Sequence, residues 1–91
     1  MSFTVVWTPE VRDDFINQWL NADSKTRNRF TAIANAMDRY LASDPESCGT
    51  PHPADPESLI CTLPGFTPKV SITFEVKAAD RLVRVTGLYI Y

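Results

Sequence analysis

The chain has 91 residues, of which 44% are hydrophobic and 22% charged, so we expect a single globular domain over residues 1–91. A formal net charge of −2 disfavours strong non-specific binding to nucleic acid or to an anionic membrane. No segment approaches the roughly 18 apolar residues of a spanning helix, and Met1 to Trp7 do not resemble a secretory signal. We therefore expect a soluble, cytoplasmic protein.

The N-terminal half predicts a short strand followed by two helices. Phe3 to Trp7 are β-branched and aromatic, as in a strand, and Thr8-Pro9-Glu10 supplies an N-cap, a helix-compatible proline and an early acidic residue. The first helix ends at Asn21-Ala22-Asp23-Ser24, and a second begins at Asp23 or Ser24 and ends before Asp44-Pro45. Apolar residues recur at helical spacing in both, so we expect an antiparallel helical hairpin.

The C-terminal half predicts a long loop and three strands. Asp44 to Ser58 contain four prolines and one glycine, and we expect them to form no regular element. Strand-like runs follow at Leu59–Leu63, Lys69–Lys77 and Leu82–Tyr91, and they predict an antiparallel meander. Because apolar and polar residues alternate in the middle run, we expect the helices to cover one face of the sheet and water to wet the other.

The order strand, helix, helix, strand, strand, strand predicts an α+β domain. Charge is uneven along it: residues 44–57 contain four acidic and no basic side chains, whereas residues 58–91 contain four basic and two acidic ones. We therefore expect a mildly basic sheet beside an acidic strip, defined as residues 44–57.

Several short sequences follow one another in a characteristic order. They are Val5-Val6-Trp7-Thr8-Pro9-Glu10 opening a helix, Leu41-Ala42-Ser43-Asp44-Pro45 closing a long second helix, a glycine soon after, then Ile72-Thr73-Phe74-Glu75-Val76 and Val83-Arg84-Val85. Over nearly its whole length the chain resembles the RelE/ParE toxin superfamily. The resemblance implies a twisted antiparallel sheet, with the first strand inserted beside the later ones and the helical hairpin packed on one face.

Members of this superfamily are toxins of bacterial type II toxin–antitoxin (plasmid-stabilisation) pairs. One branch cleaves messenger RNA in the ribosome and another poisons DNA gyrase. The resemblance implies an antitoxin partner that covers the helical hairpin or the sheet edge. The RNA-cleaving branch commonly has an arginine early in the penultimate strand, where this chain has Ser71, and many members end in basic residues, where this chain has Gly87-Leu88-Tyr89-Ile90-Tyr91.

Five residues are candidates for a catalytic site. Lys69, Arg81 and Arg84, on or beside the last two strands, can hold a phosphate or an acidic peptide. Tyr89 and Tyr91 would share one face of a strand and can stack on a base or carry a proton. The alternative is that the cations lie on a solvated sheet face and the tyrosines pack at the edge of the core.

Four residues of the helices are candidates for protein binding. Lys25, Arg27 and Arg29 cluster at the start of the second helix, where the helix dipole disfavours cations, so they would meet either the acidic strip or an acidic partner. Trp19 lies on the apolar stripe of the first helix, where it serves either the core or a partner groove.

The sequence predicts neither a metal site nor a cofactor. His52, the single histidine, lies between two prolines and is expected to face solvent. Cys48 and Cys61 are too few for a disulfide framework, and we expect two free thiols, with Cys61 a small core residue. The spacing of these three residues matches no closed zinc pattern, and the chain has no glycine-rich phosphate loop.

Three functions fit these observations. The first is a toxin-like component that binds a protein target such as DNA gyrase, favoured because the usual ribonuclease residues are missing. The second is a ribosome-dependent or free mRNA endoribonuclease with a substituted site, and the third is a non-toxic interaction module of the same fold. An exposed sheet edge would also allow a homodimer.

Overall fold

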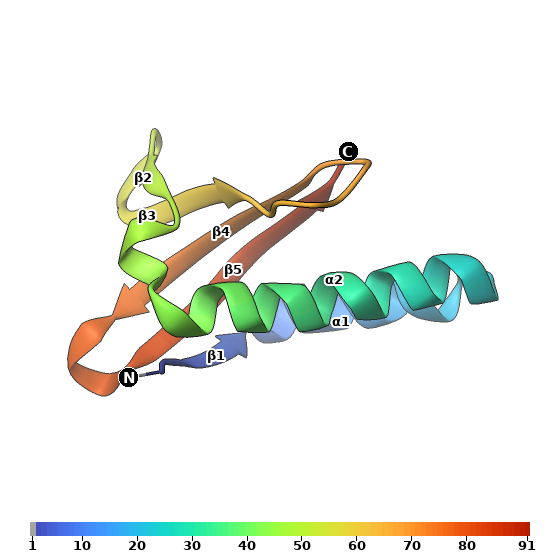
Figure 1. Cartoon of the computed structure of the whole chain (residues 1–91), viewed down its shortest axis with the longest axis horizontal. Helices are drawn as coiled ribbons and strands as arrows, with labels where there is room; N and C mark the ends of the chain where they lie inside the picture. The colour runs from blue at the N-terminus through green and yellow to red at the C-terminus, as the bar shows by residue number, and fades with distance from the viewer. Residues whose placement is uncertain (1) are drawn as a thin grey trace.

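The structure, a computed structural model, describes residues 2–91 as a layer of two helices against one sheet (Figure 1). The elements are β1 (Thr4–Trp7), α1 (Pro9–Leu20), α2 (Ser24–Ser43), β2 (Thr50–His52), β3 (Asp55–Thr62), β4 (Val70–Lys77) and β5 (Leu82–Ile90), with 3₁₀ turns at Pro45–Ser47 and Ala78–Asp80. The strand order is β1-β5-β4-β3-β2. This arrangement confirms the α+β class and the helical hairpin on one face of the sheet.

Both helices begin at the predicted caps. The side chain of Thr8 accepts a hydrogen bond from the Val11 N–H, and Pro9 occupies the first turn of α1. The Asp23 carboxylate accepts a hydrogen bond from the Thr26 N–H at 2.8 Å, and this bond holds the pKa of Asp23 below its usual value. α2 ends at Ser43, two residues before Pro45, as predicted.

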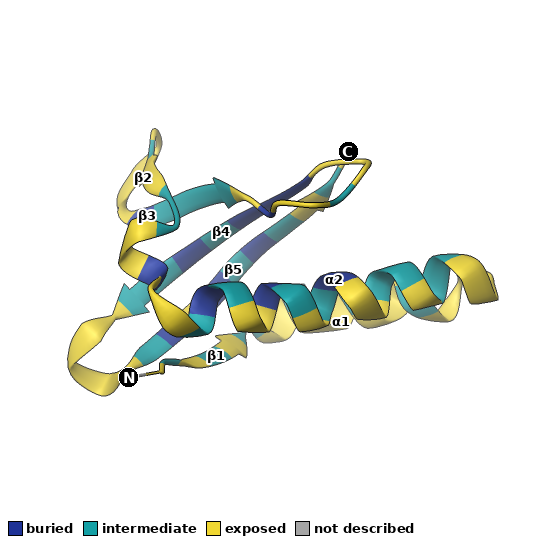
Figure 2. Ribbon diagram, in the orientation of Figure 1, coloured by how far each residue is buried: buried dark blue, intermediate teal, exposed yellow. Residues whose placement is uncertain are grey.

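The core lies between α2 and the neighbouring strands β4 and β5. Its fully buried side chains are Ile33, Met37 and Leu41 from α2, Val70, Ile72 and Phe74 from β4, and Val83 and Val85 from β5. α1 contains no fully buried residue. Figure 2 shows burial concentrated where α2 crosses the sheet, while the far end of the hairpin projects beyond it. The core therefore depends on α2 more than on α1.

The prediction of an irregular loop over residues 44–58 was wrong for the second half of that segment. β2 forms within it, and β3 begins at Asp55 instead of Leu59, so the meander has four strands. Prolines argued against a strand there, but β2 is the outermost strand, where a missing N–H on the solvent side costs no ladder bond. Gly49 supports this pairing, because a Cβ at that position would lie 2.7 Å from the carbonyl oxygen of Ile60.

The sheet is mixed, whereas the expectation was an antiparallel one. β2 to β5 are antiparallel to their neighbours, but β1 runs parallel to β5 from the Thr4–Leu82 pair to the Trp7–Val85 pair. The N–H of Phe3 donates to the Ala42 carbonyl at 2.7 Å, and the N–H of Thr4 donates to the Arg81 carbonyl at 2.8 Å. The end of α2 and the start of β5 therefore both lie beside the start of β1. β1 and β5 run parallel from this point.

None of the helices described in residues 2–91 is long and apolar enough to cross a lipid bilayer.

Candidate functional site

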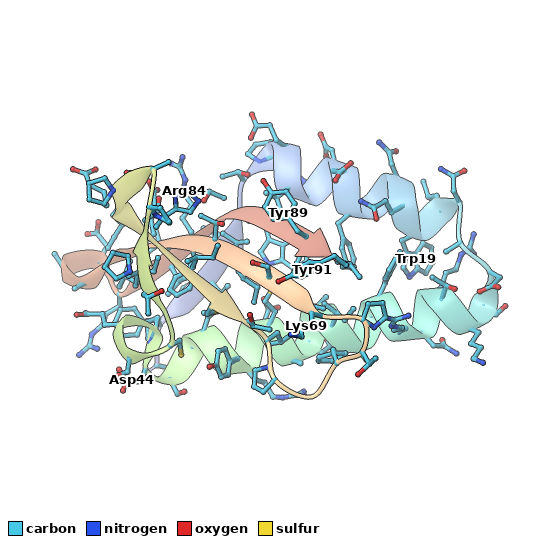
Figure 3. The ribbon with its side chains drawn as sticks, turned by 90° about the horizontal axis from the view of Figure 1, so that it is seen from above. Trp19, Asp44, Lys69, Arg84, Tyr89 and Tyr91 are labelled. Atoms are coloured by element: carbon cyan, nitrogen blue, oxygen red, sulfur yellow. The ribbon has the colours of Figure 1, made fainter. Side chains whose placement is uncertain are left out.

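The catalytic candidates lie mainly on the face of the sheet that points away from the helices, which we call the open face. Side chains alternate in direction along a strand. The side chains of Ile72 and Phe74 in β4 and of Val83 in β5 are buried against the helices, so the residues next to them along each strand belong to the open face. It presents Thr62 of β3, Thr73 and Glu75 of β4, and Arg84 and Tyr89 of β5, while Ser71 of β4 lies on the same side but is buried. Figure 3 looks toward this face and labels Lys69, Arg84, Tyr89 and Tyr91.

Lys69, Tyr89 and Tyr91 share one corner of the open face. The N–H of Tyr91 donates to the Lys69 carbonyl at 2.8 Å, so the two residues lie side by side, and Tyr89 pairs with Ser71. The tyrosines are 62% and 66% exposed. The Tyr89 ring folds back over Gly87, where an added Cβ would lie 3.2 Å from its Cε2 atom. This corner therefore offers two accessible phenols beside one cation.

Arg84 lies farther along the same face, opposite Glu75. Its Nε is 3.6 Å from the Glu75 carboxylate, and the side chains of the two residues are 53% and 20% exposed, respectively. The pair brings opposite charges together at a partly solvated surface, so Arg84 presents little net positive charge to a ligand.

Arg81 lies near the opposite end of β5 from the two tyrosines. It has a left-handed backbone with φ 52°, and its guanidinium carbon is 5.2 Å from the centre of the Phe3 ring. Glu75, the partner of Arg84, is six residues along β4 from Lys69, which corresponds to about 20 Å at the usual rise per residue. The structure therefore does not bring Lys69, Arg81 and Arg84 together.

In the basic cluster at the start of α2, Arg27 contacts the C-terminal end of α1. Its guanidinium stacks 4.5 Å from the Trp19 ring centre and donates to the carbonyls of Trp19 and Leu20 at 2.9 and 2.8 Å. A cation beside carbonyls at the C-terminal end of a helix is favourable, and Arg27 adds two side-chain hydrogen bonds there. This contact explains Trp19 and Arg27 without a partner protein.

Of the two alternatives for this cluster, contact with the acidic strip was wrong. Asp44 and the residues after it lie at the other end of α2, and a helix of 20 residues spans about 30 Å. Lys25 is exposed, and Arg29 is half-buried, with an Nη2 atom that has no hydrogen-bond partner among the described residues. Contact between this cluster and an acidic partner stays a prediction.

His52 and the cysteines have local roles. His52 is half-buried, and its Nδ1 accepts a hydrogen bond from the Ala54 N–H at 3.1 Å, so the expected solvent-facing side chain is instead part of the β2–β3 turn. Both thiols are free, as predicted. Burial raises the pKa of Cys48, and it raises the pKa of Cys61 to about 11. In residues 2–91, no three His, Cys, Asp or Glu side chains are grouped to hold a metal ion.

A groove between α1 and the last residues of β5 was missed by sequence reasoning. Its volume is about 600 Å³. The lining residues are Glu10, Val11, Asp14, Phe15 and Gln18 from α1, and Thr86, Gly87, Leu88, Tyr89, Ile90 and Tyr91 from the end of the chain. The groove exists because β1 has four residues and β5 has nine, a mismatch that becomes visible only once the two strands are known to pair.

Comparison of the chain with protein-family models, with curated proteins and with solved structures found no match. The structure itself establishes an α+β fold. Along the chain, β1 and the two helices precede the other four strands of a mixed five-stranded sheet.

Proposed function

We propose that the chain is a toxin-like component of a bacterial toxin–antitoxin pair and that it acts by binding a protein target. The resemblance to the RelE/ParE superfamily supports the class of protein. The observation that favours binding over RNA cleavage is the dispersion of cations on the open face, where Arg84 is paired with Glu75 and lies about 20 Å from Lys69.

RNA cleavage requires positive groups that converge on one phosphate, with a proton carrier within hydrogen-bond reach of the reacting oxygens. Three cations spread along the sheet do not meet this requirement. Protein binding requires instead apolar anchors surrounded by polar groups.

The projecting end of the helical hairpin supplies such anchors. Ile16 and Leu20 are one turn apart on α1 and are 45% and 56% exposed. Leu20 is the last residue of α1, and the end of the hairpin where α1 ends and α2 begins projects beyond the sheet (Figure 1). We propose that this surface contacts the target, with DNA gyrase the target class that the resemblance suggests, and that an antitoxin neutralises the protein in the cytoplasm.

The test is bacterial growth after tightly controlled induction of the full chain. Two variants accompany it: Lys69→Ala with Arg81→Ala and Arg84→Ala on the sheet, and Ile16→Ser with Leu20→Ser on the hairpin. Circular dichroism checks that both are folded. Growth arrest by the wild type and the sheet variant, relieved in the hairpin variant, is the expected result. The absence of arrest by folded wild type in a close relative of its host would favour a non-toxic interaction module.

An endoribonuclease is the second candidate, favoured by the corner where Lys69 lies beside two exposed tyrosines. Tyr89→Phe with Tyr91→Phe removes both phenols and keeps both rings. If this variant relieves the arrest and wild-type cells show cleaved messenger RNA, the ribonuclease assignment replaces the binding one. Supercoiling and translation assays then separate the targets.

A further inference from the structure

Among residues 2–91, no strand pairs with the outer edge of β5 over the second half of its length. β1 pairs with it only as far as Val85, where the Thr8 N–H donates to the Val85 carbonyl at 3.0 Å and the chain turns into α1. β5 continues to Ile90 with β4 on its other side. β1 therefore lies beside only the first half of β5. Beside the second half is the groove, and α1 forms its other side.

A bulge sets which backbone groups point into the groove. Val85 pairs with Phe74 and Gly87 pairs with Thr73, so Thr86 is the extra residue. Beyond it, the Tyr91 N–H points toward β4, because it donates to the Lys69 carbonyl. Backbone groups alternate in direction along an antiparallel strand, so the N–H and C=O groups of Leu88 and Ile90 point toward the groove. These are the groups that an added strand uses.

The side chains of the groove are apolar at its base and acidic at its rim. Val11 and Phe15 of α1 are partly buried, whereas Glu10 and Asp14 are exposed, and no Lys or Arg is among the lining residues. Glu10, Asp14 and Gln18 are each one turn apart, a repeat of about 6 Å. Alternate residues of a strand are about 6.6 Å apart. The rim thus matches the side-chain period of an extended chain.

From this geometry we infer that the groove binds an extended, basic polypeptide segment, which adds as a strand to the C-terminal half of β5, in line with β1. Alternate Lys or Arg residues place their aliphatic stems over Val11 and Phe15 and their charges beside Glu10 and Asp14. This site goes beyond the proposed function: it is separate from Ile16 and Leu20 on the hairpin, and its test does not depend on toxicity.

The test uses the full chain and a short capped peptide in which Lys alternates with Thr and Val. Fluorescence anisotropy at low salt measures the affinity of the peptide for the chain. A peptide with Glu in place of each Lys is the charge-reversed probe. The basic peptide is expected to bind at least about tenfold more tightly. Equal affinity of the two peptides, or no binding of the basic one, would overturn the inference.

Two N-methylated versions of the basic peptide test strand addition. One is methylated at its odd and the other at its even residues, so only one loses the N–H groups that face β5, while charge is unchanged. We expect one version to bind at least about tenfold more weakly than the other, and the unmethylated peptide to protect the amides of Leu88 and Ile90 from hydrogen exchange. Equal binding of both versions would show charge attraction without strand pairing and would overturn the inference.

A pair of double variants tests the rim. Glu10→Gln with Asp14→Asn should weaken the basic peptide about three- to tenfold at low salt. The matched control, Asp13→Asn with Glu46→Gln, removes two exposed carboxylates elsewhere and should change affinity less than twofold. Equal weakening of peptide binding by the two double variants would overturn the inference. Concentration-dependent self-association that protects the amides of Leu88 and Ile90 without peptide would also overturn it, because the occupant of the groove would then be a second copy of the chain.

Discussion

Single residues decide where the elements of this fold start and how closely they approach. Asp23 begins α2 through its hydrogen bond to Thr26. Gly49 allows the backbone of β2 to pack against Ile60, where no side chain fits. Asp55 organises the start of β3 by accepting bonds from the Ser58 hydroxyl at 2.8 Å and the Glu57 N–H at 3.1 Å, and these bonds lower its pKa. Each role involves a specific atom and can be tested by one substitution.

Asp23 should make stability depend on acid pH. Its folded pKa lies below the unfolded value of 3.8, so its contribution is present above that pH and is lost as pH falls through the folded pKa. We expect the Tm difference between wild type and Asp23→Asn, measured by circular dichroism, to favour wild type near pH 6 and to shrink below about pH 4. A difference that does not change with pH would contradict this, and Asp13→Asn is the control.

Gly49→Ala should destabilise the protein more than Gly87→Ala. The new methyl group at position 49 would meet a backbone oxygen at 2.7 Å, whereas at position 87 it would meet only side-chain atoms, the Tyr89 ring at 3.2 Å and the Thr73 Cβ at 3.3 Å. We expect Gly49→Ala to lower the free energy of unfolding by about 2 kcal/mol and Gly87→Ala by clearly less. Urea denaturation of both variants measures this, and the reverse order would show that the β2–β3 pairing is looser than described.

The two helices are held by different forces. α2 contributes three fully buried residues to the core, whereas α1 is attached through aromatic contacts and through Arg27. The Phe15 ring lies 5.1 Å from Trp7 and 5.7 Å from Phe30, centre to centre. The stability of the hairpin therefore depends on half-buried aromatic contacts beside the core and on the bonds of Arg27, as well as on the core itself.

Arg27→Ala should loosen the hairpin. It removes two hydrogen bonds to the end of α1 and the stacking on Trp19, and we expect the free energy of unfolding to fall by about 1–2 kcal/mol. Lys25→Ala removes an exposed cation from the same end of α2 and should change it by less than about 0.5 kcal/mol. Equal effects in urea denaturation would show that only charge matters at this site.

For the molecule as a whole, packing of the helices on the sheet determines the chemistry of the thiols. Cys61 lies on the helix-facing side of β3, beside the core, and its pKa is raised to about 11 by burial, with a smaller contribution from the nearby Cys48. A thiol protected in this way stays protonated and reacts slowly until the protein opens. The two cysteines are therefore better explained by packing than by catalysis.

Cys61 should also make the protein sensitive to alkaline pH. Its folded pKa is higher than the ordinary value of 9.0, so the thiol's contribution to stability is complete below pH 9 and is lost as pH rises toward about 11. We expect the stability of the wild type to fall more steeply than that of Cys61→Ala between about pH 9 and 11 in urea denaturation. Parallel curves for the two proteins would contradict this.

Local signals in the sequence were sufficient for the caps of both helices, the end of α2 before Pro45 and the alternation along β4, because each depends on neighbouring residues. The sequence by itself therefore determined the α+β class and the helical hairpin. The tertiary structure decided four features: the proline-containing edge strand β2, the parallel pairing of β1, the use of Arg27 by α1, and the groove beside Leu88 and Ile90. Each depends on which distant segments meet, and hydrophobic periodicity within a segment carries no information about its partner.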